Sequence, residues 1–287
     1  MFDINNRKII INNDFDGILC GEILKDLYNC EIVGFTNSKD KLHLINGHEF
    51  TGDELFIDMF TPYYDSMDQH IPPCKYEKSF CPNKERERYA FDNYVDKYPY
   101  STYIWILIDA ARKKLDIEPY IKTKTLDKDN FSRFDILLRA DDSLLNYIKY
   151  NRNAKEWANY ILSTTNNNKH LKTLFDYFSK QDREYVEAWK KNMDSYFKTK
   201  YGFKAEEIPN IESDMAKQFM SRFGINFENI TKTIDLEHHR TTIRNKKEFD
   251  DLCDKFGTKL FSFAFIYGPN KTDKNNFSYS LLITSTA

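Results

Sequence analysis

Residues 8–28, KIIINNDFDGILCGEILKDLY, join an apolar run to an amphipathic segment through a short polar turn. The run Ile9–Ile11 favours a buried strand, and the apolar residues from Leu19 to Leu27 recur every four positions, as on one face of a helix. Gly17 lies in the turn, where it lets the backbone bend tightly. The pattern predicts a strand, a loop and a helix, which is the repeating unit of a parallel sheet covered by helices.

The alternation of strands and helices continues along the first half of the chain. Further strands are predicted at 31–36, 54–59 and 134–139, and a helix at 101–115. Aromatic residues at helical spacing predict a helical region from about 144 to 223. The remainder predicts a strand at 230–234, a helix at 246–256, a strand at 259–267, a Gly-Pro-Asn turn and a strand at 277–284.

These elements predict an α/β protein with three segments. We expect a domain with a mostly parallel sheet in residues 1–145, a helical connecting region in 146–225, and a small α/β C-terminal domain in 226–287. The chain has 287 residues, of which 41% are hydrophobic, so there is enough apolar material for a packed core and disorder is not expected.

Charge and cysteine content narrow the class of protein. Lys and Arg number 42 and Asp and Glu 44, so the net charge of −2 provides no positive field that would hold long nucleic acid. No apolar run is long enough for a signal peptide or a membrane span. The five cysteines form no CxxC pair, which favours reduced thiols over a disulfide framework or a zinc site. We therefore expect a cytoplasmic protein.

Aspartates stand at the ends of several predicted strands. Asp14 and Asp16 follow the first strand, Asp58 follows a later one, and Asp141 follows the run at 134–139. Because ligands gather at the carboxyl ends of strands in open α/β sheets, these carboxylates are expected to converge. Converging carboxylates repel one another unless a cation neutralises them, so a divalent metal site is predicted. Helix capping is the alternative role for Asp14 and Asp16.

The same residues resemble the DHH phosphoesterase superfamily, which is named for an Asp-His-His motif. The likeness rests on DFDG at 14–17, on Asp58 and Asp141, and on the triplet Asp68, Gln69 and His70. The segment KYPYSTYIWILIDAARKKL at 97–115 is similar to the helix that follows the motif in many members. The resemblance covers about residues 7–146, with a weaker likeness to the family's C-terminal domain from about Asn226.

The resemblance implies a phosphoesterase that activates water with two divalent cations, with Mn²⁺ preferred and Mg²⁺ as the alternative. By position, Asp14 and Asp16 each bind one ion, Asp58 bridges them, and Asp141 completes one coordination sphere. Asp68 and His70 complete the catalytic set, with His70 as a metal ligand. The net charge favours a small nucleotide or short oligonucleotide substrate, cleaved at a phosphodiester or phosphoanhydride. The oligomeric state stays open, with a homodimer among the options.

Substrate contacts are expected from basic residues and histidines. Arg139 lies two residues before Asp141 and suits phosphate, with an ion pair to a nearby aspartate as the alternative. The family's glycine-rich GGGH loop is missing here, and His238, His239 and Arg240, expected just after the strand at 230–234, could replace it. The alternative for these histidines is an ordinary surface position.

Two other functions remain open. Gln69 stands where the family has a metal-ligating histidine, and Asn12 and Asn13 stand where a histidine usually precedes the DxD. These departures and the missing loop favour a degenerate fold that acts as a binding or assembly module. A haloacid dehalogenase-type phosphatase is the third option, because its DxDGT nucleophile motif resembles DFDG. In that case Asp14 would form a covalent aspartyl-phosphate.

Overall fold

The computed structural model describes residues 3–73, 78–93, 96–122, 131–265 and 276–283. The chain forms two compact units. The sheet unit contains Met1–Asn12, Cys30–Lys97 and Phe227–Ala287, and the helical unit contains Asn13–Asn29 and Tyr98–Asn226. Within the described ranges, no helix is both long enough and apolar enough to cross a membrane.

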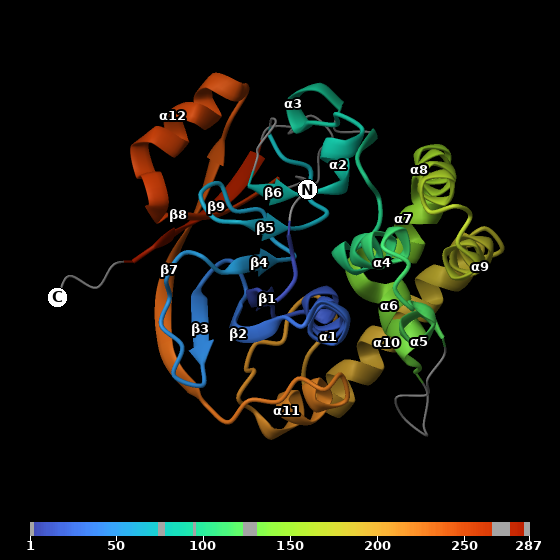
Figure 1. The fold of residues 1–287 in the computed structure, drawn as a ribbon, viewed down its shortest axis with the longest axis horizontal. Coiled ribbons are helices and arrows are strands. Elements are labelled where there is room, and N and C mark those ends of the chain that lie inside the picture. Colours follow the sequence, from blue (N-terminus) through green and yellow to red (C-terminus); the bar gives the residue numbers. More distant parts are fainter. Residues whose placement is uncertain (1–2, 74–77, 94–95, 123–130, 266–275, 284–287) are drawn as a thin grey trace. The chain divides into compact units, whose positions relative to one another are not determined.

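The described residues of the sheet unit contain a nine-stranded sheet in the order β6-β5-β4-β1-β2-β3-β7-β9-β8 (Figure 1). Its strands are β1 (Lys8–Asn12), β2 (Glu31–Thr36), β3 (Lys41–Ile45), β4 (Leu55–Ile57), β5 (Ser66–Met67), β6 (Ser79–Phe80), β7 (Ile230–Thr242), β8 (Leu260–Phe265) and β9 (Asn276–Leu282). Neighbouring strands from β6 to β2 are parallel, and those from β2 to β8 are antiparallel. The unit also contains α2 (Pro82–Glu85), α3 (Ala90–Asn93), α12 (Lys246–Phe256) and the 3-10 turn η3 (Gly257–Lys259). The fold is α/β with a mixed sheet.

The central strands β1 and β4 each contain a run of three buried apolar residues. Every side chain of Ile9–Ile11 and of Leu55–Ile57 has no solvent exposure. A strand that is buried on both faces needs such a continuous apolar run, and this explains why neither segment alternates apolar and polar residues. Polar residues begin at the carboxyl ends, where Asn12 is the last residue of β1 and Asp58 follows β4.

The sheet curls so that its last strand, β8, packs against β4. The rings of Phe56 in β4 and Phe261 in β8 meet edge to face, with their centroids 5.2 Å apart. Nearby, the N–H of Phe263 donates to the carbonyl of Phe60 at 3.1 Å. The same apolar cluster includes residues of β1, β3 and β7. Strands from both ends of the sequence therefore share one core.

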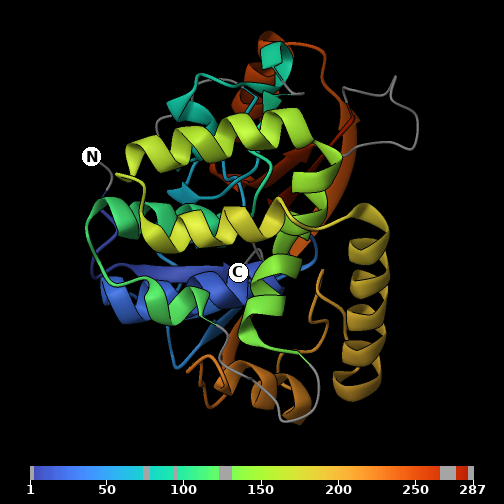
Figure 2. The same ribbon diagram turned by 90° about the vertical axis from the view of Figure 1, so that its right-hand side faces the viewer.

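The helical unit contains, within its described residues, α1 (Phe15–Tyr28), α4 (Thr102–Arg112), α5 (Glu118–Ile121), α6 (Arg133–Arg139), the 3-10 turn η2 (Ala140–Asp142), α7 (Ser143–Lys149), α8 (Asn151–Thr164), α9 (Lys169–Phe178), α10 (Arg183–Tyr201) and α11 (Asp214–Ser221). Helix α1 packs against α4, and α8 runs beside α9 (Figure 2, yellow-green and yellow). The hydroxyl of Tyr28, at the end of α1, donates to the carboxylate of Asp109 in α4 at 2.6 Å. These contacts hold α1 against α4 within the helical unit.

The helices expected after DFDG, at 101–115 and at 246–256 are confirmed, as is the strand at 31–36. The strand expected at 134–139 is wrong, because these residues form α6. The cause is a capping box: Ser132 Oγ accepts the N–H of Asp135, and the Asp135 carboxylate accepts the N–H of Ser132. This reciprocal pair satisfies two helix-end donors and starts a helix in which Ile136, Leu137 and Leu138 are buried. Asp141 therefore follows a helix rather than a strand.

The C-terminal strands do not form a sheet of their own. The strand expected at 230–234 continues to Thr242 as β7, which pairs along its first half with β3. Residues 41–45 form β3, a strand that the sequence pattern did not predict, and their pairing with β7 joins the two parts of the sheet. The compact units thus follow other boundaries than 145 and 225, and the three-segment division by function stays a prediction. The Gly-Pro-Asn turn lies outside the described residues.

The contact between Phe56 and Phe261 predicts the effect of Phe261→Ala. Both rings are fully buried, so truncation leaves a cavity and removes the edge-to-face contact. We expect the free energy of unfolding to fall by about 3–5 kcal/mol, measured by urea denaturation followed by circular dichroism. Tyr185→Ala, at a ring that is 53% exposed, is the control and should change stability little. Equal midpoints for the two variants would contradict the curled sheet.

Candidate metal centre

Three polar side chains lie at one edge of the sheet unit, where the parallel strands β1, β4 and β5 end. Ile57 pairs with Ile11 on one side and with Met67 on the other. The residues that follow, Asn12, Asp58 and Asp68, therefore stand at the same carboxyl edge. The sequence predicted this placement for Asp58, and the two-residue strand β5 brings Asp68 beside it.

Asp58 is buried and held in an uncommon backbone conformation. Its side chain is 2% exposed, and its φ of 64° lies in the left-handed region. The N–H of Asp58 donates to the carbonyl of Met67 at 2.9 Å, and the amide of Asn12 donates to Asp58 Oδ2 at 3.3 Å. Non-glycine residues adopt such a φ at a cost of about 1–3 kcal/mol, and they do so often at functional sites.

The DQH triplet lies directly after β5. Asp68 has no solvent exposure, and its Oδ1 accepts the N–H of His70 at 2.7 Å. The His70 side chain is 39% exposed, and its Nδ1 lies 3.4 Å from Asp68 Oδ1. Gln69 is held through its carbonyl, which accepts the amide of Asn83 at 2.9 Å. The triplet thus has a buried acid beside a histidine that reaches solvent.

Asp16 belongs to the helical unit, and its carboxylate caps a second helix. It is 1% exposed, and its two oxygens accept the N–H groups of Thr102 at 2.7 Å and Tyr103 at 2.8 Å. These N–H groups open α4, where they have no partner within the helix and where the helix dipole favours a negative charge. The sequence predicted the start of α4 at Ser101, but the contact with Asp16 is made only in the folded unit.

Asp14 has the capping role that was the alternative to metal binding. Its Oδ1 accepts the N–H of Gly17 at 2.8 Å, and this bond begins α1. One carboxylate oxygen is therefore engaged in starting the helix. The role of Asp14 as a metal ligand stays a prediction.

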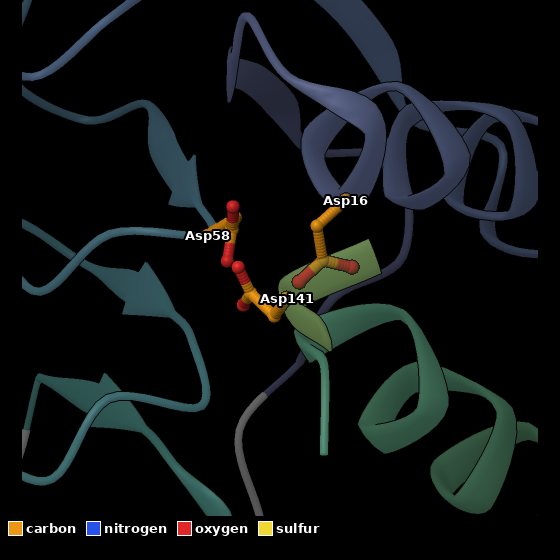
Figure 3. A group of neighbouring side chains, drawn as sticks. All are labelled: Asp16, Asp58 and Asp141. Carbon is orange, nitrogen blue, oxygen red and sulfur yellow. The ribbon is translucent and has the colours of Figure 1, made fainter. Parts of the chain in front are cut away.

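Asp141 lies beside Asp16 in the helical unit. Carboxylate oxygens of the two residues are within 4.8 Å of each other (Figure 3). Asp141 sits in η2 with a φ of 46°, and its carbonyl accepts the amide of Asn146 at 2.8 Å. Two carboxylates at this separation repel, and oxygen ligands of this kind are those that Mn²⁺ and Mg²⁺ prefer. Their chemistry thus fits a hard divalent cation.

Arg139 is engaged by acidic residues rather than facing an open site. Its guanidinium, 2% exposed, bonds to Asp142 at 2.7 Å, to both oxygens of Asp194 at 3.1 and 3.2 Å, and to Glu206 at 2.6 Å. Burial alone would lower the pKa of Arg139, but these three acids raise it above its usual value. The ion-pair alternative for Arg139 is therefore the arrangement found. Arg133 is likewise buried and paired with Glu22.

The expected loop cluster of His238, His239 and Arg240 is wrong in its setting, because all three residues lie within β7. His239 stacks on Tyr279 with the ring centroids 5.0 Å apart, and His238 Nδ1 lies 3.4 Å from Ser280 Oγ. Burial, Lys39 and Arg240 lower the pKa of His238. Residues that alternate along a strand point to opposite faces, so the two histidines cannot form one contact surface. The β-branched and apolar residues around them continue the strand beyond residue 234.

A separate buried acid, Glu54, fixes the loop before β4. Its carboxylate accepts the N–H groups of Thr51 and Gly52, the Thr51 hydroxyl and His48 Nε2, the last at 2.6 Å. His48 also lines a cavity of about 390 Å³. Burial alone would raise the pKa of Glu54, but the bonds from Thr51 and His48 lower it below its usual value.

The lowered pKa of Glu54 predicts a pH dependence of stability. Above about pH 4.3, the pKa of an unfolded glutamate, the full stabilisation by the carboxylate is present, and it is lost as the pH falls through the lower folded pKa. Glu54→Gln should cost about 1.5–3 kcal/mol at pH 7, and the difference from wild type should shrink between pH 5 and pH 3. Urea titrations at several pH values measure this, with the exposed Glu49→Gln as control. A difference that is constant with pH would refute it.

Asp16 and Asp141 should respond in opposite ways to neutralisation. In chelator, Asp16→Asn should lower the free energy of unfolding by about 1–3 kcal/mol, because an amide nitrogen then faces a backbone donor. Asp141→Asn should leave stability unchanged or raise it, because it removes repulsion and asparagine tolerates a positive φ. Thermal unfolding with EDTA tests both variants. Equal destabilisation would show that repulsion between the two carboxylates does not decide the effect of Asp141 on stability.

No family model, curated protein or solved structure matches this chain. The likeness to the DHH phosphoesterases therefore stays a prediction that rests on short motifs. The function must be inferred from the chemistry of the residues themselves.

Proposed function

We propose that this chain is a divalent-metal-dependent phosphoesterase in which Asp16 and Asp141 of the helical unit bind a cation. The resemblance to the DHH pattern adds Asp58 to the proposed ligands. Mn²⁺ is the expected ion, with Mg²⁺ as the alternative, and the substrate class is a short nucleotide or oligonucleotide. The observation that carries the proposal is the pair Asp16 and Asp141, whose carboxylates lie within 4.8 Å while Asp16 is buried. A cation at this pair would neutralise both charges.

Chain connectivity supports Asp58 as the third ligand. Within the sheet unit, the amide of Asn12 contacts the Asp58 carboxylate. Asp16 follows Asn12 by four residues, and four residues of chain span at most about 14 Å. The chain therefore keeps Asp16 within that distance of the end of β1. A second cation, if bound, would require Asp14 and His70.

The chemistry expected at this site is hydrolysis by activated water. A bound divalent cation would polarise a phosphoryl oxygen and lower the pKa of a nearby water. Asp68 holds the backbone of His70 and lies 3.4 Å from its Nδ1. The imidazole is exposed enough to exchange a proton with water or with the leaving oxygen of a substrate. The helix start that holds Asp16 orients its carboxylate, and the helix dipole favours a negative charge there.

The size of the substrate is inferred from charge. The chain carries a net charge of −2, and the buried Arg139 and Arg133 are both engaged by acids. Neither arginine offers an open fork for a phosphate backbone. A short substrate, held chiefly by the cation, fits these residues better than a long nucleic acid.

A degenerate fold that binds metal or nucleotide without turnover is the second candidate. Two observations favour it: Asp14 is engaged as a helix cap, and Arg139 is saturated by acidic partners. Asp14 was a candidate metal ligand, and Arg139 was a candidate substrate contact. This candidate predicts cation binding without hydrolysis.

Turnover by metal-stripped protein tests the proposal. Mn²⁺ or Mg²⁺ is restored, and the substrates are a linear dinucleotide, a cyclic dinucleotide, a short single strand and pyrophosphate. We expect Mn²⁺-dependent hydrolysis that Asp58→Asn lowers by about 100-fold. The matched control is Asp53→Asn. Asp53 is an exposed acid that precedes β4 in the chain, so this variant should keep full activity.

The other outcomes separate the rival functions. Mn²⁺ binding by calorimetry without hydrolysis of any substrate would favour the binding module. A phosphate trapped on Asp14 in the intact protein would identify a haloacid dehalogenase-type enzyme. Absence of both binding and turnover would overturn the metal site itself.

A further inference from the structure

We propose that Arg139 is a positioning residue: through Asp142 it holds the turn at 140–142 in the conformation that presents the Asp141 carboxylate to the cation. This inference rests on the proposed metal site. In this inference Arg139 does not contact the substrate. It acts through Asp142, the residue next to the proposed ligand Asp141.

The turn at 140–142 has a backbone that its own residues do not favour. Asp141 and Asp142 both have a positive φ, 46° and 52°. Two consecutive left-handed residues without glycine cost about 1–3 kcal/mol each, and they persist only where surrounding contacts impose them. The turn therefore needs external restraints, and without them Asp141 would move away from Asp16.

Two basic side chains provide the first restraint, because both bond to the carboxylate of Asp142. One oxygen of Asp142 accepts Arg139 Nη1 at 2.7 Å, and the other accepts Lys190 Nζ at 2.5 Å. The guanidinium is itself fixed by Asp194 in α10, which engages it with both oxygens. Because the planar guanidinium of Arg139 is held by several partners, its orientation is fixed. Arg139 and Lys190 therefore place Asp142 relative to α10.

Hydroxyl and amide groups provide the second restraint, on either side of Asp141. The Ser143 hydroxyl donates to the carbonyl of Ala140 at 2.9 Å and accepts the N–H of Ser101 at the same distance. Ser101 is the N-cap of α4, the helix whose first N–H groups hold Asp16. The start of α4 therefore contacts both Asp16 and the turn that carries Asp141. The ion pairs of Arg139 restrain the rest of that turn.

Mn²⁺ affinity in a double-mutant cycle tests this role. Asp142→Ala removes both cationic contacts and disfavours the positive φ, so we expect the Kd for Mn²⁺, measured by calorimetry on stripped protein, to rise about tenfold. Asp142→Asn, which tolerates the positive φ, should show a smaller rise. In the Asp141→Asn background, adding Asp142→Ala should change nothing further, because its effect runs through Asp141.

Controls keep each outcome distinct. Lys190→Met removes one of the two ion pairs of Asp142. We expect this variant to fold and to bind Mn²⁺ more weakly than wild type. It replaces Asp142→Ala if that variant does not fold. Lys191→Met, at the exposed neighbour on α10, should not. An unchanged Kd in the folded Asp142 or Lys190 variant, or effects that multiply in the double variant, would overturn the inference. Wild-type protein that binds no Mn²⁺ would instead overturn the proposed function, and the inference with it.

Discussion

The contact between Asp16 and the first turn of α4 is the constraint on which the candidate site depends. A carboxylate that is 1% exposed has lost its water, and the N–H groups of Thr102 and Tyr103 replace that solvation. The bond satisfies the helix start at the same time, because those N–H groups have no partner inside α4. One interaction therefore fixes α1 against α4 and solvates a buried carboxylate inside a packed unit.

The two acids of the pair differ in how the fold holds them. Asp16 is restrained directly, through hydrogen bonds to its own carboxylate. Asp141 is restrained through its backbone and its neighbours, and it is partly exposed. This division suits a ligand-binding site, because one member is rigid and the other can adjust to the ion.

Local patterns predicted the elements whose signals are local. The strand and helix around DFDG, the helix after Ser101 and the helix at 246–256 formed as expected, because apolar spacing and caps act over a few residues. Residues 134–139 failed because a short apolar run fits either element, and the capping box decided for a helix. The pairing of β3 with β7, the contact of Asp16 with α4 and the partners of Arg139 all join residues far apart in sequence. Periodicity carries no information about such partners.

The sequence order of the two units has a consequence for biosynthesis. Residues 98–226 of the helical unit are inserted between parts of the sheet unit, and 13–29 interrupt the sheet unit near its start. The second edge of β3 is paired only by β7, which follows nearly two hundred residues later in the chain. On the ribosome, the amino-terminal strands therefore emerge long before their partners, and folding is expected to be slow because closing so distant a contact costs chain entropy. Neither unit corresponds to one continuous fragment, so limited truncation from the C-terminal side removes strands from the core that the first residues helped to build.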